Sequence, residues 1–314
     1  MLKRRRIDSV LNVSSAHSVI RHKKAPRLLV LLSPATLKKK AEHIFAENSE
    51  PTAAGLLQAM ILGEAQRVPR PVKDAMIRTG TWHIMVVSGS HTAFLAFVFL
   101  LILKILRLPR RLRYILTATC VVVYCFLTGA STPVVRATCM TLVFLASFIV
   151  ERNTLFYHTL ALAALVIVFF DPSALFQVGF QLSFTSVFFI VWLYPKVYPQ
   201  PLLDRMAPAT FWLGRVARCL VSYAMVAFCA WVGTTPILLY HFQSISWVTV
   251  PANVLVVPVA MAAVSAGFME LLAGFLAPPL AVWFASACEG LIYLLLRLNA
   301  VFAGLPWGYM KIPS

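Results

Sequence analysis

The sequence has 314 residues, of which 60% are hydrophobic and only 12% are charged. Roughly a quarter of the residues of a soluble domain are charged, so this composition excludes an ordinary soluble globular protein. Together with several long apolar runs, it predicts an all-α polytopic membrane protein. The formal net charge of +17 favours contact with anionic lipid or with polyanions.

The N-terminal segment 1–54 is predicted to be a basic arm, because eleven Lys and Arg residues fall within residues 1–40. "SPATLKKKAEHIF" (33–45) has apolar residues at helical spacing and a basic face, which is typical of a short amphipathic helix on a membrane surface. Lys38, Lys39 and Lys40 on this helix are candidates for attracting DNA or another polyanion.

A transmembrane domain is predicted over residues 55–306, followed by a short tail at 307–314. Its first part, 53–80, predicts two short helices separated at Val68–Pro71, both too short to cross a bilayer and therefore re-entrant or interfacial. About eight candidate transmembrane helices follow, some of them expected to be broken. They cover 83–106, 112–128, 133–150, 155–170, 174–194, 216–240, 247–274 and 280–303.

Lys and Arg concentrate in the connections after the first and the fifth candidate spans, whereas "GASTP", "DPSAL" and "HFQSIS" contain neither. The positive-inside rule places the two basic connections in the cytoplasm. Eight spans would then put both termini outside the cytoplasm, which conflicts with a basic arm that normally stays inside. The side of the N-terminal arm is left open.

Polar side chains interrupt the apolar spans. The first span opens with Ser88, Gly89, Ser90, His91 and Thr92, and Ser88, His91 and Thr92 share one helix face. Such residues either bond between helices or face water.

The fifth span carries Gln177, Gln181 and Thr185 at i, i+4 and i+8, and Arg136 follows Pro133 at the mouth of the third span. Further polar residues and prolines lie around the sixth and seventh spans: Thr234, Thr235, Pro236, His241, Gln243, Ser244, Pro251, Asn253 and Pro258. Because several segments share this feature, we favour a common hydrated interior.

Catalytic chemistry is weakly indicated. Ser88 or Ser90 with a histidine could form an intramembrane hydrolase dyad, but no nearby carboxylate orients the imidazole. Asp171 precedes Pro172 and is interpreted as a turn residue at a helix end. We expect no catalytic residue, no metal site and no cofactor, and the absence of a glycine-rich phosphate loop predicts that another protein supplies any driving force.

Four sequence elements resemble those of the competence domain of ComEC-type DNA-uptake channels, in the same order. They are "GLLQAMILGE" with "GTWHIMVVSGSH", then "GASTPVVRATCM", "DPSALFQVGFQLSF" and "TTPILLYHFQSISWVTVPANVLVVP". The first departs from the family pattern, because Ser90 stands where a leucine is usual.

The resemblance implies a multi-pass channel core in the bacterial inner membrane, through which single-stranded DNA enters during natural transformation. It implies separate DNA-receptor, nuclease and cytoplasmic motor proteins as partners and leaves a homo-oligomer open. The apolar stretch 28–32 would be a remnant of the family's OB-like domain. The positions that match the motifs are Ser88, Gly89, His91, Gly129, Pro133, Arg136, Asp171, Gly179, Gln181, Ser183, Pro236, His241, Ser246, Asn253 and Pro258.

Three alternatives stay open at this point. A small-solute permease would use the same polar interior, a truncated family member would have no activity, and an intramembrane serine hydrolase would use Ser88 or Ser90.

Overall fold

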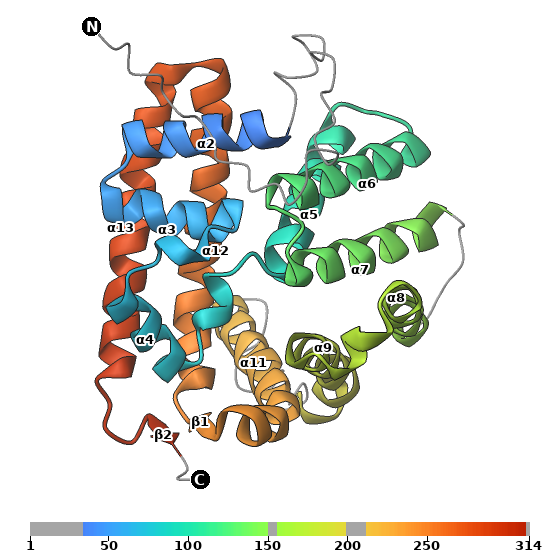
Figure 1. The fold of residues 1–314 in the computed structure, drawn as a ribbon, viewed down its shortest axis with the longest axis vertical. Helices are drawn as coiled ribbons and strands as arrows, with labels where there is room; N and C mark the ends of the chain where they lie inside the picture. The colour runs from blue at the N-terminus through green and yellow to red at the C-terminus, as the bar shows by residue number, and fades with distance from the viewer. Residues whose placement is uncertain (1–33, 150–155, 199–211, 312–314) are drawn as a thin grey trace, which may run out of the picture.

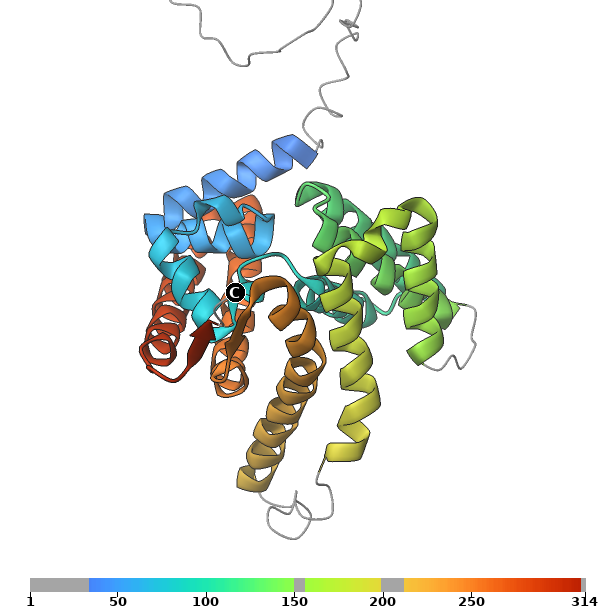
Figure 2. The ribbon, with the colours of Figure 1, turned by 60° about the horizontal axis from the view of Figure 1, so that its bottom comes forward.

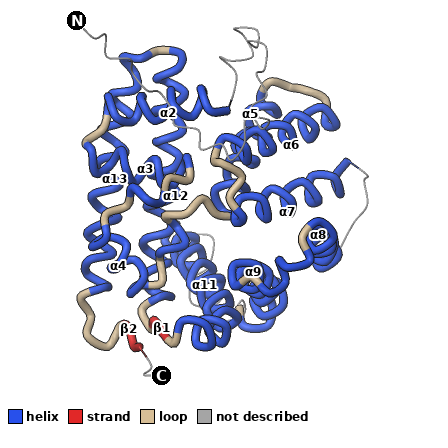
Figure 3. Tube along the Cα trace, viewed as in Figure 1, coloured by secondary structure: helices blue, strands red, loops and turns tan. Residues whose placement is uncertain are grey.

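The computed structural model describes residues 34–149, 156–198 and 212–311, and helices dominate these ranges (Figure 3). The α-helices are α2 (Pro34–Asn48), α3 (Pro51–Leu62), α4 (Arg70–Thr79), α5 (Gly89–Ile105), α6 (Arg110–Leu127), α7 (Thr132–Ile149), α8 (Phe156–Phe170), α9 (Val178–Val197), α11 (Trp212–Phe242), α12 (Thr249–Leu276) and α13 (Pro278–Ala303). Three short 3-10 helices are η2 (Ala65–Arg67), η3 (Trp82–Ile84) and η4 (Pro172–Phe176), and two strands are β1 (Ser244–Ser246) and β2 (Tyr309–Lys311).

A helix occupies each of the eight predicted spans, with boundaries that differ by a few residues. The first, α5, begins later than predicted because Ser88 caps it and η3 precedes it. The amphipathic helix and the two short helices predicted upstream are α2, α3 and α4. The apolar stretch 28–32 lies outside the described residues, as does most of the connection between the fifth and sixth spans.

The fold is that of a helical membrane protein. Five of its helices (α7, α9, α11, α12 and α13) are long and apolar enough to cross a membrane, whereas the apolar helices α5 and α8 have 17 and 15 residues. Large apolar side chains such as Phe170 and Trp283 face outward, as lipid contact requires. In Figure 1, α12 and α13 run along the long axis while α6 and α7 run across it, so these helices do not follow one membrane normal. The number of eight spans therefore stays a prediction.

The main core surrounds α3, which lies against α2, α12 and α13 (Figure 1). Leu57, Met60 and Ile61 of α3 are fully buried and belong to one cluster with Val264 of α12 and Leu295 of α13. This short helix, which the sequence places in a re-entrant or interfacial position, is thus enclosed by protein.

Helices α9 and α11 lie side by side, as Figure 2 shows. They approach closely because Gly233 of α11 has no side chain: a Cβ there would come within 2.5 Å of Cγ of Phe189 on α9. Helix α11 continues through Pro236 and α12 through Pro258, so the chain breaks between these helices rather than at either proline. At that break β1 pairs antiparallel with β2, with Ile245 opposite Met310.

Candidate functional site

The N-terminus of α5 is built by a cap that links Ser88 and His91. The backbone N–H of Ser88 donates to Nδ1 of His91 at 3.2 Å, and the Ser88 hydroxyl lies 2.8 Å from that of Ser90. Since Nδ1 accepts a hydrogen bond, the neutral ring carries its proton on Nε2. His91 and Thr92 are buried, and the hydroxyl of Thr92 donates to the carbonyl of Ser88 at 3.4 Å.

Helix α7 lies next to this cap and starts from a tight turn. Gly129 has φ +79°, the left-handed conformation that glycine adopts without strain, and Pro133 sits in the first turn of α7. A Cβ on Gly89 of α5 would be 3.9 Å from Cβ of Ala137, so the first turn of α5 packs against the second turn of α7. Arg136 precedes Ala137 and is only 6% exposed.

Arg136 reaches across to α9. Its Nη2 donates to the hydroxyl of Ser183 at 3.3 Å. A Cβ on Gly179, one turn before Ser183, would stand 3.1 Å from Nη2 and 3.3 Å from Nη1. The guanidinium therefore lies against the first turn of α9, where the missing side chain of Gly179 leaves room for it.

Asp171 and the two glutamines shape the connection from α8 to α9. The carboxylate of Asp171 accepts from the backbone N–H and the hydroxyl of Ser173, at 3.1 and 2.6 Å, and from Nε2 of Gln177 at 3.3 Å. Nε2 of Gln181 donates to the carbonyl of Leu175 at 3.1 Å. These contacts hold η4 in place, while Thr185 lies half-buried further along α9. Asp171 is thus found in the turn where the sequence predicts it.

The remaining motif residues lie around β1 and the flanking helices. The carbonyl of Ser246 accepts from Nε1 of Trp231 and from the hydroxyl of Thr249, both at 3.0 Å. Asn253 is half-buried in the first turns of α12. The exposed motif residues of this region are Pro236, His241 and Pro258.

Buried polar atoms without a partner coincide with these motifs. Among the described residues they are Nε2 of His91, Nε of Arg136, Oγ1 of Thr138, Oγ of Ser246, Oδ1 of Asn253 and Oε2 of Glu270. Buried polar atoms in folded proteins almost always have a protein or water partner. Four of these six residues are ones that the family motifs pick out from the sequence. Each of these four motif side chains therefore has one buried polar atom whose hydrogen bonding water or a polar ligand would complete.

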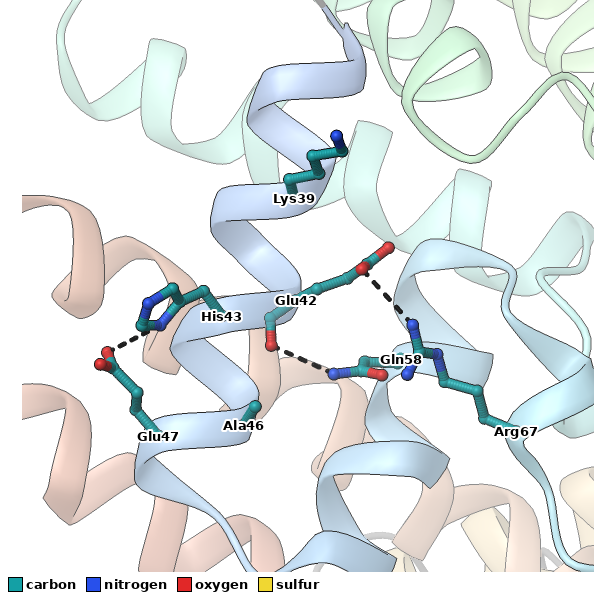
Figure 4. Close-up of a pocket in the computed structure, with 7 residues that line it drawn as sticks. All are labelled: Lys39, Glu42, His43, Ala46, Glu47, Gln58 and Arg67. Atoms are coloured by element: carbon teal, nitrogen blue, oxygen red, sulfur yellow. Dashed lines mark hydrogen bonds and ion pairs between the residues drawn. The ribbon is translucent and has the colours of Figure 1, made fainter. Parts of the chain in front are cut away.

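The predicted DNA-attracting lysines lie on α2, above α3. Lys38 pairs with Glu64, and the amine of Lys40 lies 4.5 Å from the ring centroid of Phe275. Lys39 lines a hollow between α2 and the start of the α3–α4 connection (Figure 4). An ion pair between Arg67 and Glu42 borders that hollow, and Nδ1 of His43 lies 3.0 Å from a carboxylate oxygen of Glu47. Both Lys38 and Lys40 thus help to fix α2 to the bundle, and attraction of DNA stays a prediction for all three lysines.

Sequence reasoning missed Glu270 and Thr138. Glu270 lies inside α12 and is fully buried; its Oε1 accepts from the hydroxyl of Ser49 at 3.3 Å. An acidic residue within an apolar span is a functional candidate by default, and that signal is present in the sequence. Thr138 offers no such signal, because a lone threonine in an apolar helix commonly bonds to its own backbone.

Several known proteins are similar to this chain in sequence. Residues 60–314 match the sequence family described as "Competence protein". The chain is similar to ComE operon protein 3 of Bacillus subtilis, with 32% identity over 208 residues, which cover 66% of this chain and 25% of that protein. It is also similar to Competence protein ComA of Neisseria gonorrhoeae, with 31% identity over 146 residues, which cover 44% of this chain and 21% of that protein.

An uncharacterized protein of Aquifex aeolicus is 31% identical over 248 residues, which cover 77% of this chain and 51% of that protein. No solved structure matches the chain. The chain thus spans from about a fifth to half the length of these curated relatives. Because the family match extends over most of the sequence and includes all four motif elements from Ser88 onward, the chain belongs to the competence protein family.

Proposed function

We propose that this chain forms the core of a channel in the bacterial inner membrane through which single-stranded DNA passes during natural transformation. Membership of the competence family and the names of the Bacillus and Neisseria relatives support a role in competence. A separate motor would supply the force, and separate receptor and nuclease proteins would deliver the strand. Membrane lipid surrounds the apolar outer faces.

The observation that carries the proposal is the coincidence of motif residues with buried, unpartnered polar atoms. Nε2 of His91 offers a proton, Oδ1 of Asn253 offers lone pairs, and Nε of Arg136 adds a charged donor. A single strand needs polar groups along its path and a positive charge for its phosphates, not base-specific contacts. The motif residues supply both kinds of group.

The hydrolase alternative depends on Ser88 and His91, whose Oγ and Nδ1 lie 3.3 Å apart. This contact belongs to the helix cap, in which Nδ1 already accepts the backbone N–H of Ser88. A general base needs that nitrogen free to take the serine proton. The geometry of the cap therefore accounts for the contact without a reaction.

Planar-bilayer recording tests the channel against a small-solute permease. The purified chain should conduct ions, and a single-stranded oligonucleotide should block the current in a voltage-dependent way while duplex DNA of equal length does not. Asn253→Leu removes the amide whose Oδ1 is buried without a partner, and it should lower both the conductance and the block by DNA. The matched control is Asn48→Leu, because Asn48 lies on α2 and its amide donates to the carbonyl of Ile44 at 2.8 Å.

Solute flux that no DNA affects would favour the permease instead. Equal effects of the two asparagine exchanges would remove Asn253 from the conducting path.

A further inference from the structure

Arg136 is a buried cation without a counter-ion in the described part of the chain. Its side chain is 6% exposed, its Nη2 bonds to the neutral hydroxyl of Ser183, and its Nε has no partner. No carboxylate of the described residues forms an ion pair with it. Buried charges are normally paired, because an isolated charge loses its hydration without compensation.

The contact with α9 makes this position more unfavourable for a lone cation. The guanidinium lies against Gly179 in the first turn of α9. The first backbone N–H groups of a helix have no partner within the helix and carry a partial positive charge. No side chain caps the start of α9, and its first turn holds no acidic residue. Two positive groups therefore lie close together, and no acidic side chain of the described residues pairs with either of them.

The nearest acidic residue in sequence does not fill this place. Asp171 lies seven residues before the start of α9, and its two carboxylate oxygens accept hydrogen bonds from Ser173 and Gln177. Gln177 in turn directs its side chain to Asp171 and leaves the start of α9 uncapped. The local contacts thus keep the carboxylate of Asp171 occupied and leave the start of α9 without a side-chain cap.

We infer that Arg136 and the uncapped N-terminus of α9 together bind one phosphate group. The guanidinium supplies charged N–H donors, and the first amides of α9 supply a second set, which is the usual way in which helix N-termini hold phosphate. Ser183 orients the guanidinium, and Gly179 leaves the space that it occupies. Which molecule supplies this phosphate group depends on the proposed function, under which it is a phosphodiester of single-stranded DNA.

Binding measurements on the purified full chain in detergent test this site without any transport. Isothermal calorimetry with inorganic phosphate is the first arm. The second arm compares a single-stranded oligonucleotide with the same oligonucleotide carrying uncharged methylphosphonate linkages. The third arm compares nanodiscs with and without phosphatidylglycerol. Arg136→Gln should weaken phosphate binding by about tenfold or more, because charge-assisted hydrogen bonds are the strong ones. Arg111→Gln on α6 is the control, because Arg111 is exposed and this exchange removes the same charge.

Gly179→Ala tests the geometry with the charge retained. A Cβ at this position would lie 3.1 Å from Nη2, so the guanidinium has to shift by a few tenths of an ångström, and we expect phosphate binding to weaken although Arg136 is present. If Arg136→Gln fails to fold, phosphate binding by Gly179→Ala still tests the site. Absence of phosphate binding to the wild-type chain, or equal losses in Arg136→Gln and Arg111→Gln, would overturn the site.

The three arms separate this inference from the proposed function. If inorganic phosphate binds through Arg136 and the charged oligonucleotide competes with it, both stand. If phosphate binds but only phosphatidylglycerol competes, the anion site stands with a lipid ligand and the assignment to DNA fails. If the oligonucleotide blocks bilayer currents while phosphate never binds at Arg136, the channel stands and this site fails.

Discussion

At the scale of single residues, Tyr124 holds together two parts of the fold. Its hydroxyl, buried within α6, donates to the carbonyl of Ile61 near the end of α3 at 2.9 Å. The ring also packs against Phe268 of α12, with centroids 6.1 Å apart. One phenol therefore joins the helices of the motif region to the main core.

Tyr124→Phe keeps the ring and removes only the hydroxyl, which leaves the carbonyl of Ile61 buried without that donor. We expect the free energy of unfolding to fall by about 1–2 kcal/mol. Thermal unfolding of the purified chain in detergent measures the change. Tyr240→Phe is the control, because Tyr240 is 82% exposed. Equal melting temperatures for wild type and Tyr124→Phe would show that this bond adds no stability.

The sequence indicated which residues to consider for the candidate site, but it did not indicate which residues they contact. The sequence identifies Arg136 from its motif and places it at the mouth of a span. Its contacts with Gly179 and Ser183 join two helices far apart in the chain, and no periodicity reports such a contact. Similarly, the polar run Ser88–Thr92 is evident, whereas the cap that starts α5 at Gly89 depends on local hydrogen bonds.

At the scale of helices, small residues decide how closely neighbours approach. Helix pairs in membranes associate through close packing, which small side chains permit. Gly233 allows α9 and α11 to meet, and the nearest atoms of Phe189 include its Cβ, at 2.7 Å from a Cβ on Gly233. Because that atom is attached to the backbone of α9, rotation of the phenyl ring cannot remove the clash.

Gly233→Ala should therefore destabilise the chain by about 1–3 kcal/mol through overpacking. The same exchange at Gly290 of α13 is the matched control, since a Cβ there meets no atom of the described chain within 4 Å. Alanine favours a helix over glycine by about 1 kcal/mol, so Gly290→Ala should leave the melting temperature unchanged or raise it. A similar shift in both variants would contradict close packing at Gly233.

Helix positions followed well from the apolar runs, since every predicted span contains a helix. The burial of α3 did not follow, because a mainly apolar helix of twelve residues fits an interfacial position as well as an enclosed one. Enclosure depends on α2, α12 and α13 meeting around it, which is a property of the tertiary fold. The prolines were equally ambiguous. Pro236 and Pro258 predicted kinked or interrupted helices, and both helices continue through them without an interruption.

At the scale of the whole molecule, the fold brings three of the four motif elements into one region. The starts of α5 and α7 pack at Gly89 and Ala137, and Arg136 links α7 to the start of α9. The fourth element lies around β1 and the first turns of α12. The sequence predicted which motif elements occur, but not that the helices run in different directions. Hydropathy reports the length of an apolar segment and not the direction of its helix axis.

The claim that this chain provides a path for transforming DNA is tested most directly by transformation frequency. A strain that lacks the chain should bind duplex DNA at its surface as the parent does, but should yield transformants only at the level of spontaneous mutation. The wild-type chain should restore transformation, and Asn253→Leu should not restore it fully although the protein reaches the membrane in normal amount. Transformation of the deletion strain at the parental frequency would contradict the account.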